Sequence, residues 1–186
     1  YYYMMRKAIQ LMRVMPADRI LDLGAGTGRN ACLIGSYLST KGELIGVDIS
    51  KEMISQFKKN CADFSNIKII NARIDQDLPY ERCFDKVFIS FVLHGFPQNA
   101  RNQIVINALK ALKKGGEFYI LDYNEFSVGE IPFYLRIYFN FIECPYAFDF
   151  IGKDWKKTLS LQGFNDFREY FFFSGFMRLL KGVKIL

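Results

Sequence analysis

Short apolar runs alternate with amphipathic stretches along most of this chain. The apolar runs predict buried strands, because a strand covered on both faces carries a nearly continuous hydrophobic sequence. They lie at residues 20–23, 44–47, 67–70, 86–91 and 118–121. The amphipathic stretches predict helices at 4–14 and 30–38, a helix that begins after the N-cap residue Ser50, and helices at 104–115 and 153–161.

The last two apolar runs, 164–172 and 177–185, are separated only by a short link near residues 174–175. A link this short joins antiparallel strands, because a parallel crossover needs about a dozen residues or more. The order of elements therefore predicts an α/β fold whose mainly parallel sheet ends in one antiparallel hairpin. No internal repeat or linker interrupts the pattern, so we expect a single domain over residues 1–186.

The composition is that of a soluble globular protein. Of the 186 residues, 51% are hydrophobic and 24% are charged, which excludes disorder, collagen and coiled coils. No apolar run reaches the ~18 residues of a membrane-spanning helix, and the chain does not open on a secretory signal. The net charge of +6 can favour an anionic partner, but the charges form no basic block, and scattered surface charge is the simpler interpretation.

Cysteine usage points to a reducing environment. Cysteines stand at positions 32, 61, 83 and 144, without a CxxC pair, and the chain has a single histidine. This spacing predicts no metal site and no disulfide framework. We interpret the cysteines as buried free thiols of a cytoplasmic protein.

A glycine-rich loop is the strongest local signal. Gly24, Gly26 and Gly28 follow the first predicted strand, and glycines let a loop approach a ligand without a Cβ in the way. A dinucleotide fingerprint would place its third glycine at Arg29, and no Gly-Lys-Ser/Thr follows as in a P-loop. Asp22 adds a carboxylate beside the loop, which would repel a phosphate and attract an amine or another cation.

Acidic residues also follow the next two strands. Asp48 ends the second strand, where a carboxylate can accept both hydroxyls of a ribose. The alternative is a helix-entry residue ahead of Ser50. The acids of loop 73–80, after the third strand, could accept from an adenine amine, and a polar surface loop is the alternative there.

Together these motifs resemble the class I S-adenosylmethionine-dependent methyltransferases. The resemblance rests on four segments: Gly24 to Gly28 after residues 21–23, Asp48, residues 75–80 followed by 84–87, and residues 109–118. The last segment is similar to the "LKPGG" turn of that family, with Lys114 in place of proline. It covers roughly residues 16–125. The 78–80 loop and the Leu93-His94 segment are most similar to the small-molecule branch that includes quinone-biosynthesis methyltransferases.

The resemblance implies a Rossmann-like, mostly parallel seven-stranded sheet with helices on both faces, and S-adenosylmethionine as the cofactor, with S-adenosylhomocysteine as the product. Asp48 would take the ribose, and Asp75 and Gln76 compete for the adenine contact. The full set of implied cofactor residues is Asp22, Gly24, Ala25, Gly26, Gly28, Asn30, Asp48, Ile49, Met53, Ile74, Asp75, Ser90 and Phe91.

The acceptor side is less sharply marked. His94 is the candidate general base, because its imidazole titrates near neutrality, and structural hydrogen bonding in its loop is the alternative. Asp122 and Tyr123 are candidate polar contacts with the acceptor. An aromatic segment at about 126–155, with Arg136 and Phe139 as candidate contacts, would suit a hydrophobic ring. Core packing and base stacking are the alternatives for these aromatic residues.

We therefore expect methyl transfer to a small, hydrophobic or aromatic acceptor. The alternatives are an RNA methyltransferase and a non-catalytic cofactor-binding module. The tetrad that relatives of this fold use on exocyclic amines and glutamine amides, Asn/Asp-Pro-Pro-Tyr/Phe, is absent after the fourth strand, which argues against methylation of adenine N6 or of glutamine but leaves other RNA targets open. Because the positive charges are scattered, we expect no nucleic-acid partner. The basic residues Arg178, Lys181 and Lys184 suggest a solvated hairpin edge or, alternatively, a membrane-surface contact. We make no prediction of oligomeric state.

Overall fold

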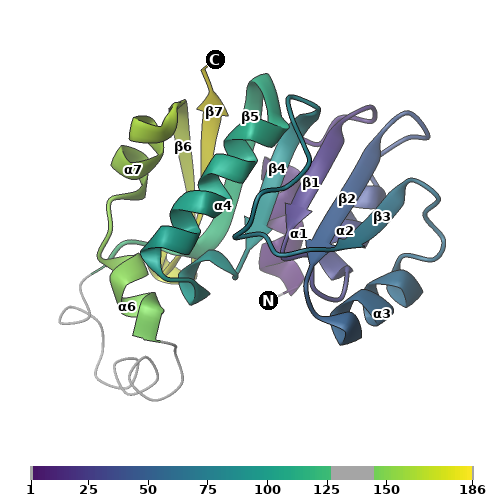
Figure 1. Ribbon diagram of the computed structural model, residues 1–186, viewed down its shortest axis with the longest axis horizontal. Coiled ribbons are helices and arrows are strands. Elements are labelled where there is room, and N and C mark those ends of the chain that lie inside the picture. The colour runs from purple at the N-terminus through teal and green to yellow at the C-terminus, as the bar shows by residue number, and fades with distance from the viewer. Residues whose placement is uncertain (1, 127–144, 186) are drawn as a thin grey trace.

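A computed structural model describes residues 2–126 and 145–185 of the chain. Its seven-stranded sheet has the order β3-β2-β1-β4-β5-β7-β6, and β7 runs antiparallel to both of its neighbours (Figure 1). The remaining pairs are parallel. The strands are β1 Arg19–Leu23, β2 Glu43–Asp48, β3 Ile67–Asn71, β4 Phe84–Ser90, β5 Leu112–Tyr123, β6 Phe164–Phe172 and β7 Met177–Lys184. The predicted fold class is confirmed.

Helices cover both faces of the sheet, and each face has its own hydrophobic core. On one face α4 and α7 pack over the sheet, and Ile104, Val105 and Ala108 of the predicted apolar stripe are fully buried there. On the other face α1 and α2 pack together, and Phe57 of α3 joins them. The helices are α1 Tyr2–Leu11, α2 Arg29–Gly35, α3 Lys51–Asn60, α4 Gln98–Ala111, α6 Pro145–Ile151 and α7 Trp155–Gln162, with 3-10 turns η1 Leu93–Gly95 and η3 Phe173–Gly175.

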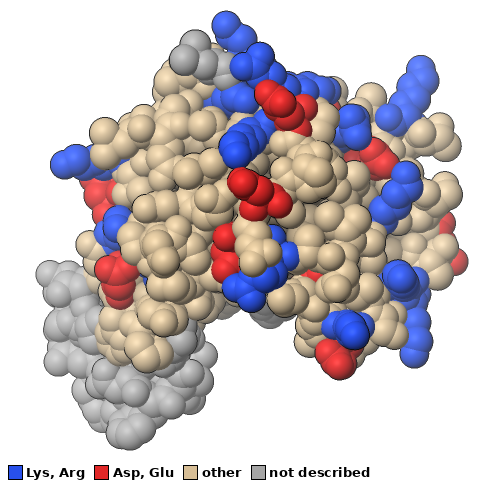
Figure 2. All heavy atoms as spheres, in the orientation of Figure 1, with Lys and Arg blue, Asp and Glu red and all other residues tan. Residues whose placement is uncertain are grey.

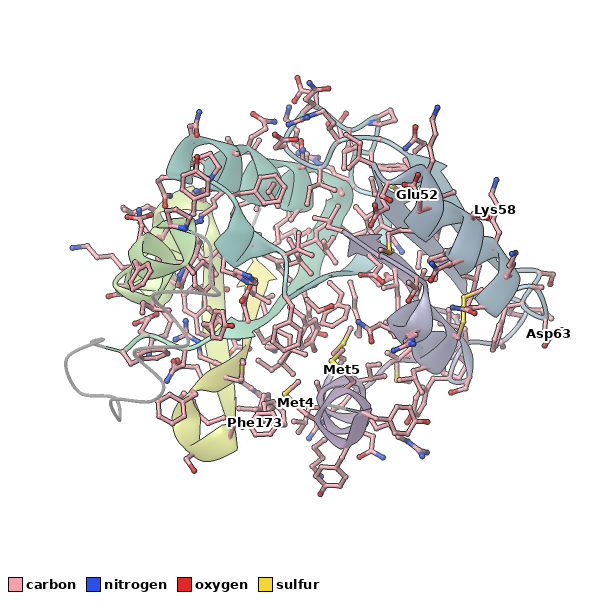
Figure 3. The ribbon with its side chains drawn as sticks, turned by 90° about the horizontal axis from the view of Figure 1, so that it is seen from below. Met4, Met5, Glu52, Lys58, Asp63 and Phe173 are labelled. Carbon is pink, nitrogen blue, oxygen red and sulfur yellow. A yellow bond between two sulfur atoms is a disulfide. The ribbon has the colours of Figure 1, made fainter. Side chains whose placement is uncertain are left out.

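The parallel strands all end at one edge of the sheet, which Figure 3 views from below. At this edge β1 lies between β2 and β4, and the chain continues from β1 to β2 on one side but from β4 to β5 on the other, so the strand order reverses between β1 and β4. Ligands of open α/β sheets bind in the crevice at such a switch point. The fold therefore brings the loops that follow β1 to β5 to one place, although they come from distant parts of the sequence.

Helix α4 ends earlier than the sequence predicted. We expected a helix to residue 115, but it ends at Ala111, and Leu112 already pairs with Phe84 in the sheet. The ammonium group of Lys184 explains the early end. It donates to the carbonyl oxygens of Leu109 (2.8 Å) and Leu112 (2.7 Å), which satisfies the helix terminus with a buried cation.

The basic residues of the C-terminal hairpin are not a solvated or membrane-facing edge. Arg178, Lys181 and Lys184 are all buried. Arg178 pairs with Glu125 at 2.8 Å and Lys181 pairs with Glu117 at 3.1 Å. Both interpretations of this cluster were wrong, because tertiary contacts neutralise charges that look exposed in the sequence. Among the described residues, the helices are all too short or too polar to cross a membrane.

Two of the cysteines form a disulfide (Figure 3). Cys32 of α2 and Cys61, which directly follows α3, have their Cα atoms 5.6 Å apart. The expectation of free thiols is wrong for this pair, because α2 and α3 pack side by side and bring together residues 29 positions apart. Cys83 is free, and Cys144 lies outside the described residues.

Gly46 of β2 lies in close contact with the loop that follows β1 and with α3. A Cβ at this position would lie 2.9 Å from the Cβ of Ala25 and 2.9 Å from Cε2 of Phe57. We predict that Gly46→Val lowers the free energy of unfolding by about 1–3 kcal/mol through overpacking, measured by urea denaturation. Gly152→Ala is the control, because its new Cβ would come no closer than 3.6 Å to the Phe148 carbonyl oxygen. Equal stability of Gly46→Val and the control would contradict this account.

Candidate cofactor site

The glycine loop folds back over the end of β2. The backbone N–H groups of Gly24 and Ala25 both donate to the carbonyl oxygen of Val47, at 2.8 and 3.1 Å. Gly26 has a φ of 54° with open space where a Cβ would be, so its backbone is accessible to a ligand. Gly28 has a φ of 80°, and its Cβ would lie 2.8 Å from the ring of Phe57. Both positions therefore need glycine.

Asp48 holds this loop in place. Its Oδ2 accepts from the backbone N–H of Gly26 (2.8 Å), and its Oδ1 accepts from the N–H of Ser50 (2.9 Å). Ser50 in turn caps α3 by accepting from the N–H of Met53. Each carboxylate oxygen can accept a second hydrogen bond, so Asp48 keeps capacity for ribose hydroxyls while it organises the loop.

Two hollows lie on either side of the glycine loop and share Gly24. The first has a volume of about 320 Å³ and is lined by Gly24, Asp48, Ile49, Ala72, Arg73, Ile74, Asp75, Val92 and Phe96. The second has a volume of about 270 Å³ and is lined by Gly24, Ala25, Gly26, Thr27, Arg29, Asn30 and Ser90. Most of the cofactor residues implied by the resemblance are thus brought together. Four residues of that set are not among the lining residues of either hollow, namely Asp22, Gly28, Met53 and Phe91.

The second hollow is closed by a side-chain contact between distant elements. Asn30, in the first turn of α2, donates from Nδ2 to Oγ of Ser90 at the end of β4, over 3.0 Å. Both residues were expected near the cofactor on the basis of the resemblance alone. The contact connects the helix that follows the glycine loop to the neighbouring strand.

In the first hollow, the geometry favours Asp75 over Gln76 as the adenine contact, because only Asp75 is among the lining residues. Asp75 accepts two hydrogen bonds from the guanidinium of Arg73, at 3.0 and 2.7 Å. These bonds lower the pKa of the Asp75 carboxyl. Arg73 was not singled out in the sequence, although a charged pair two residues apart could have drawn attention to it.

Asp22 is the most unusual group at the site. It is 1% exposed, and neither carboxylate oxygen has a hydrogen-bond partner among the described residues. Burial, together with the nearby charge of Asp48, raises its pKa to about 7. A buried carboxylate without a partner is costly, and a ligand with a cationic amine would supply what it lacks. S-Adenosylmethionine carries such an amine, so this orphaned group fits the implied cofactor.

His94 and Asp122 face each other at the ends of β4 and β5. Asp122 Oδ1 lies 2.7 Å from His94 Nδ1, and Oδ2 accepts from the His94 backbone N–H at 3.2 Å. The backbone N–H of Tyr123 also donates to Oδ1 at 2.8 Å. Asp122 was predicted as an acceptor contact, but the structure gives it another task. It is 1% exposed and orients both the ring and the backbone of His94.

The aromatic segment is only partly described. Arg136 and Phe139 lie outside the described residues, as do all the other aromatic residues between 131 and 144. Phe150 and Trp155 are buried in the core beside α4, so the packing alternative holds for these two. Tyr123 is 9% exposed, and its ring lies against His94 with centroids 5.1 Å apart. Within residues 2–126 and 145–185, His, Cys, Asp and Glu form no cluster that could hold a metal.

Comparisons with known proteins address the family and the fold of the chain. A family model described as a methyltransferase domain matches residues 15–159. The chain is 26% identical over 160 residues to a demethylmenaquinone methyltransferase of Listeria welshimeri, which covers 84% of this chain and 66% of that protein. The chain therefore spans about two thirds of the length of this relative.

Two solved structures show the same fold. A SAM-dependent methyltransferase from Aquifex aeolicus has a TM-score of 0.72 at 14% identity, over 97% of this chain and 89% of that one. Phosphoethanolamine N-methyltransferase 2 of Haemonchus contortus, in complex with S-adenosyl-L-methionine, has a TM-score of 0.76 at 16% identity. The match covers 99% of this chain and 53% of that one.

The buried carboxyl of Asp22 makes stability depend on pH. Its pKa is about 7 in the folded protein and near 3.8 when unfolded, so folding favours the protonated form. This contribution is fully present below pH ~4 and is lost as pH rises through ~7. We predict that Asp22→Asn gains about 2–3 kcal/mol relative to the wild type between pH 5 and pH 8, measured by urea denaturation. A stability difference that does not change with pH would show that Asp22 has an ordinary pKa.

Proposed function

Because the chain belongs to the methyltransferase domain family, we propose that it transfers a methyl group from S-adenosylmethionine to a small, hydrophobic or aromatic acceptor. The family match and the shared fold confirm the predicted class I S-adenosylmethionine-dependent methyltransferase and its cofactor. The chain spans only part of its curated relative, so the activity of the whole protein and its acceptor belong to the proposal.

The observation that carries the proposal is the His94–Asp122 pair beside the cofactor hollows. The backbone N–H groups of His94 and Tyr123 donate to the Asp122 carboxylate, and Nδ1 of His94 lies 2.7 Å from its Oδ1. We propose that Nδ1 carries the ring proton and donates it to the carboxylate, which leaves Nε2 as the basic nitrogen. This is the arrangement of a general base held in one tautomer by a buried carboxylate.

When bound, the cofactor supplies an electrophilic methyl group on a positively charged sulfur and leaves as S-adenosylhomocysteine. The protein has to place a nucleophile in line with that methyl group, and positioning supplies most of the rate gain. His94 Nε2 would accept the proton that a hydroxyl or ring carbon of the acceptor loses. Asp122 then stabilises the imidazolium that forms.

Aromatic surroundings support a ring-shaped acceptor. The His94 ring lies against the ring of Tyr123, with centroids 5.1 Å apart. Val92 and Phe96 add apolar surface to the adjoining hollow. A relative named demethylmenaquinone methyltransferase makes a phenol or hydroquinone ring the acceptor class to test first. Such a ring has a hydroxyl whose proton a histidine can accept.

Charge placement gives little support to a nucleic-acid substrate. On the face in Figure 2, Lys and Arg side chains are scattered among acidic and uncharged residues. Several cations of the +6 net charge, including Lys86, Arg101 and Arg178, are buried in the fold. We therefore propose a small-molecule acceptor.

Cofactor binding should depend on Asp48. We predict that calorimetry detects binding of both S-adenosylmethionine and S-adenosylhomocysteine, and that Asp48→Ala weakens both at least about tenfold, because about 1.4 kcal/mol of hydrogen bonding is lost. Asp63→Ala is the control, since Asp63 lies on an exposed turn beyond α3 (Figure 3). No heat with either ligand in the wild type would overturn the proposed function.

Methyl transfer should depend on His94. We predict that His94→Gln slows transfer from labelled S-adenosylmethionine to reduced short-chain demethylmenaquinone by about 10²–10⁴-fold, because the basic nitrogen is lost. Cofactor affinity should stay unchanged in the variant, which separates loss of the base from loss of the site. An undiminished rate in His94→Gln would exclude this histidine as the base.

A further inference from the structure

Helix α4 carries two buried polar side chains that reach different halves of the site. Arg101 is 0% exposed and Asn107 is 2% exposed. They lie on the same helix, six residues apart, and neither lines a cofactor hollow. Polar groups are buried at such a cost only when each donor finds an acceptor, so their partners show what the two side chains hold in place.

Arg101 binds the turn that carries His94. All five of its N–H donors have acceptors. Nε donates to the carbonyl of Leu93 (3.2 Å), and one terminal nitrogen donates to the carbonyl of His94 (3.1 Å). The remaining acceptors are the Tyr146 carbonyl (2.5 Å), the Asp149 carboxylate (2.6 Å) and the Gln98 side chain (3.4 Å).

The same guanidinium also ties this turn to α6. Tyr146 and Asp149 belong to α6, and the Arg101 guanidinium lies over the rings of Phe150 and Trp155, at 5.3 and 6.0 Å. One buried cation therefore joins α4, the η1 turn and α6. A lysine could not replace it, because its three donors sit on one atom and cannot reach acceptors on three elements.

Asn107 holds the backbone of the loop on the proposed adenine side of the site. Its Nδ2 donates to the carbonyl oxygens of Ile74 (2.9 Å) and Gln76 (2.6 Å), and its Oδ1 accepts from Gln103 (3.2 Å). Ile74 and the adjacent Asp75 line the first hollow. The amide thus fixes the backbone on both sides of the residue expected to contact adenine.

We propose that α4 is a shared positioning element, in which Asn107 sets the loop that closes the cofactor hollow and Arg101 sets the His94 turn. Neither is a catalytic residue, because neither touches the predicted ligands. The assignment of Asn107 to the cofactor side and of Arg101 to the His94 side of the site rests on the proposed function. The two variants are controls for each other, since both change a buried polar residue of the same helix.

The first measurement is cofactor affinity by calorimetry with S-adenosylhomocysteine. Asn107→Leu removes both donors at similar volume and should weaken binding about tenfold, because the loss of about 1.4 kcal/mol in loop order corresponds to that factor. Arg101→Lys keeps the charge and should change the affinity less than about twofold. The more exposed partner Gln103 offers a milder variant, Gln103→Ala, with a smaller effect in the same direction.

The second measurement follows His94 directly. It is the only histidine in the chain, so its ring C–H signals in an NMR spectrum of the tag-free protein are assigned without ambiguity. Arg101→Lys should shift and broaden these signals, and Asn107→Leu should leave them in place. Asp149→Asn, which loosens Arg101 only at its exposed partner, should move them in the same direction by less.

The proposal is supported if Asn107→Leu weakens cofactor binding without moving the His94 signals, and Arg101→Lys moves those signals without weakening binding. If both variants change both readouts together, or if neither changes either one, α4 is only a packing element and the proposal is wrong. The NMR arm needs no acceptor and no cofactor. Absence of cofactor binding in the wild type would therefore overturn the proposed function while the positioning of His94 was still tested.

Discussion

The glycine loop has to cross the end of β2 at backbone contact distance, and the rest of the site depends on this constraint. The loop N–H groups bind the Val47 carbonyl and the Asp48 carboxylate. The approach requires Gly28 and Gly46 to lack side chains, because Phe57 fills the space that their Cβ atoms would take. In the adjoining strand β1, Asp22 is buried and its carboxylate has no hydrogen-bond partner among the described residues.

Features that depend on local pattern could be read from the sequence. The strands are short apolar runs, the hairpin link is short, and the three glycines and Asp48 stand at strand ends. Since parallel strands share one carboxyl edge, knowing the strands was enough to place Asp48 beside the loop. The resemblance supplied what pattern alone could not, namely the assignment of Asn30 and Ser90 to one candidate site, and the structure adds the hydrogen bond between them.

Features that depend on contacts between distant elements were missed. The Cys32–Cys61 disulfide needs the packing of α2 on α3, and the early end of α4 needs a lysine 72 residues away. Arg101 was not singled out in the sequence. Charges counted as surface charge in the sequence were in fact structural cations, since Arg101 and Arg178 are both buried. Net charge therefore says little about partners when some of the charged residues are buried inside the fold.

The orphaned carboxyl of Asp22 has a consequence for how the protein would respond to its surroundings. With a pKa of about 7, it holds a proton in a large share of molecules at neutral pH. A cationic amine arriving beside it would favour the ionised form and release that proton. Under the proposed function, cofactor binding therefore releases a proton, and the fraction of the enzyme that holds cofactor increases as the pH of the surroundings rises.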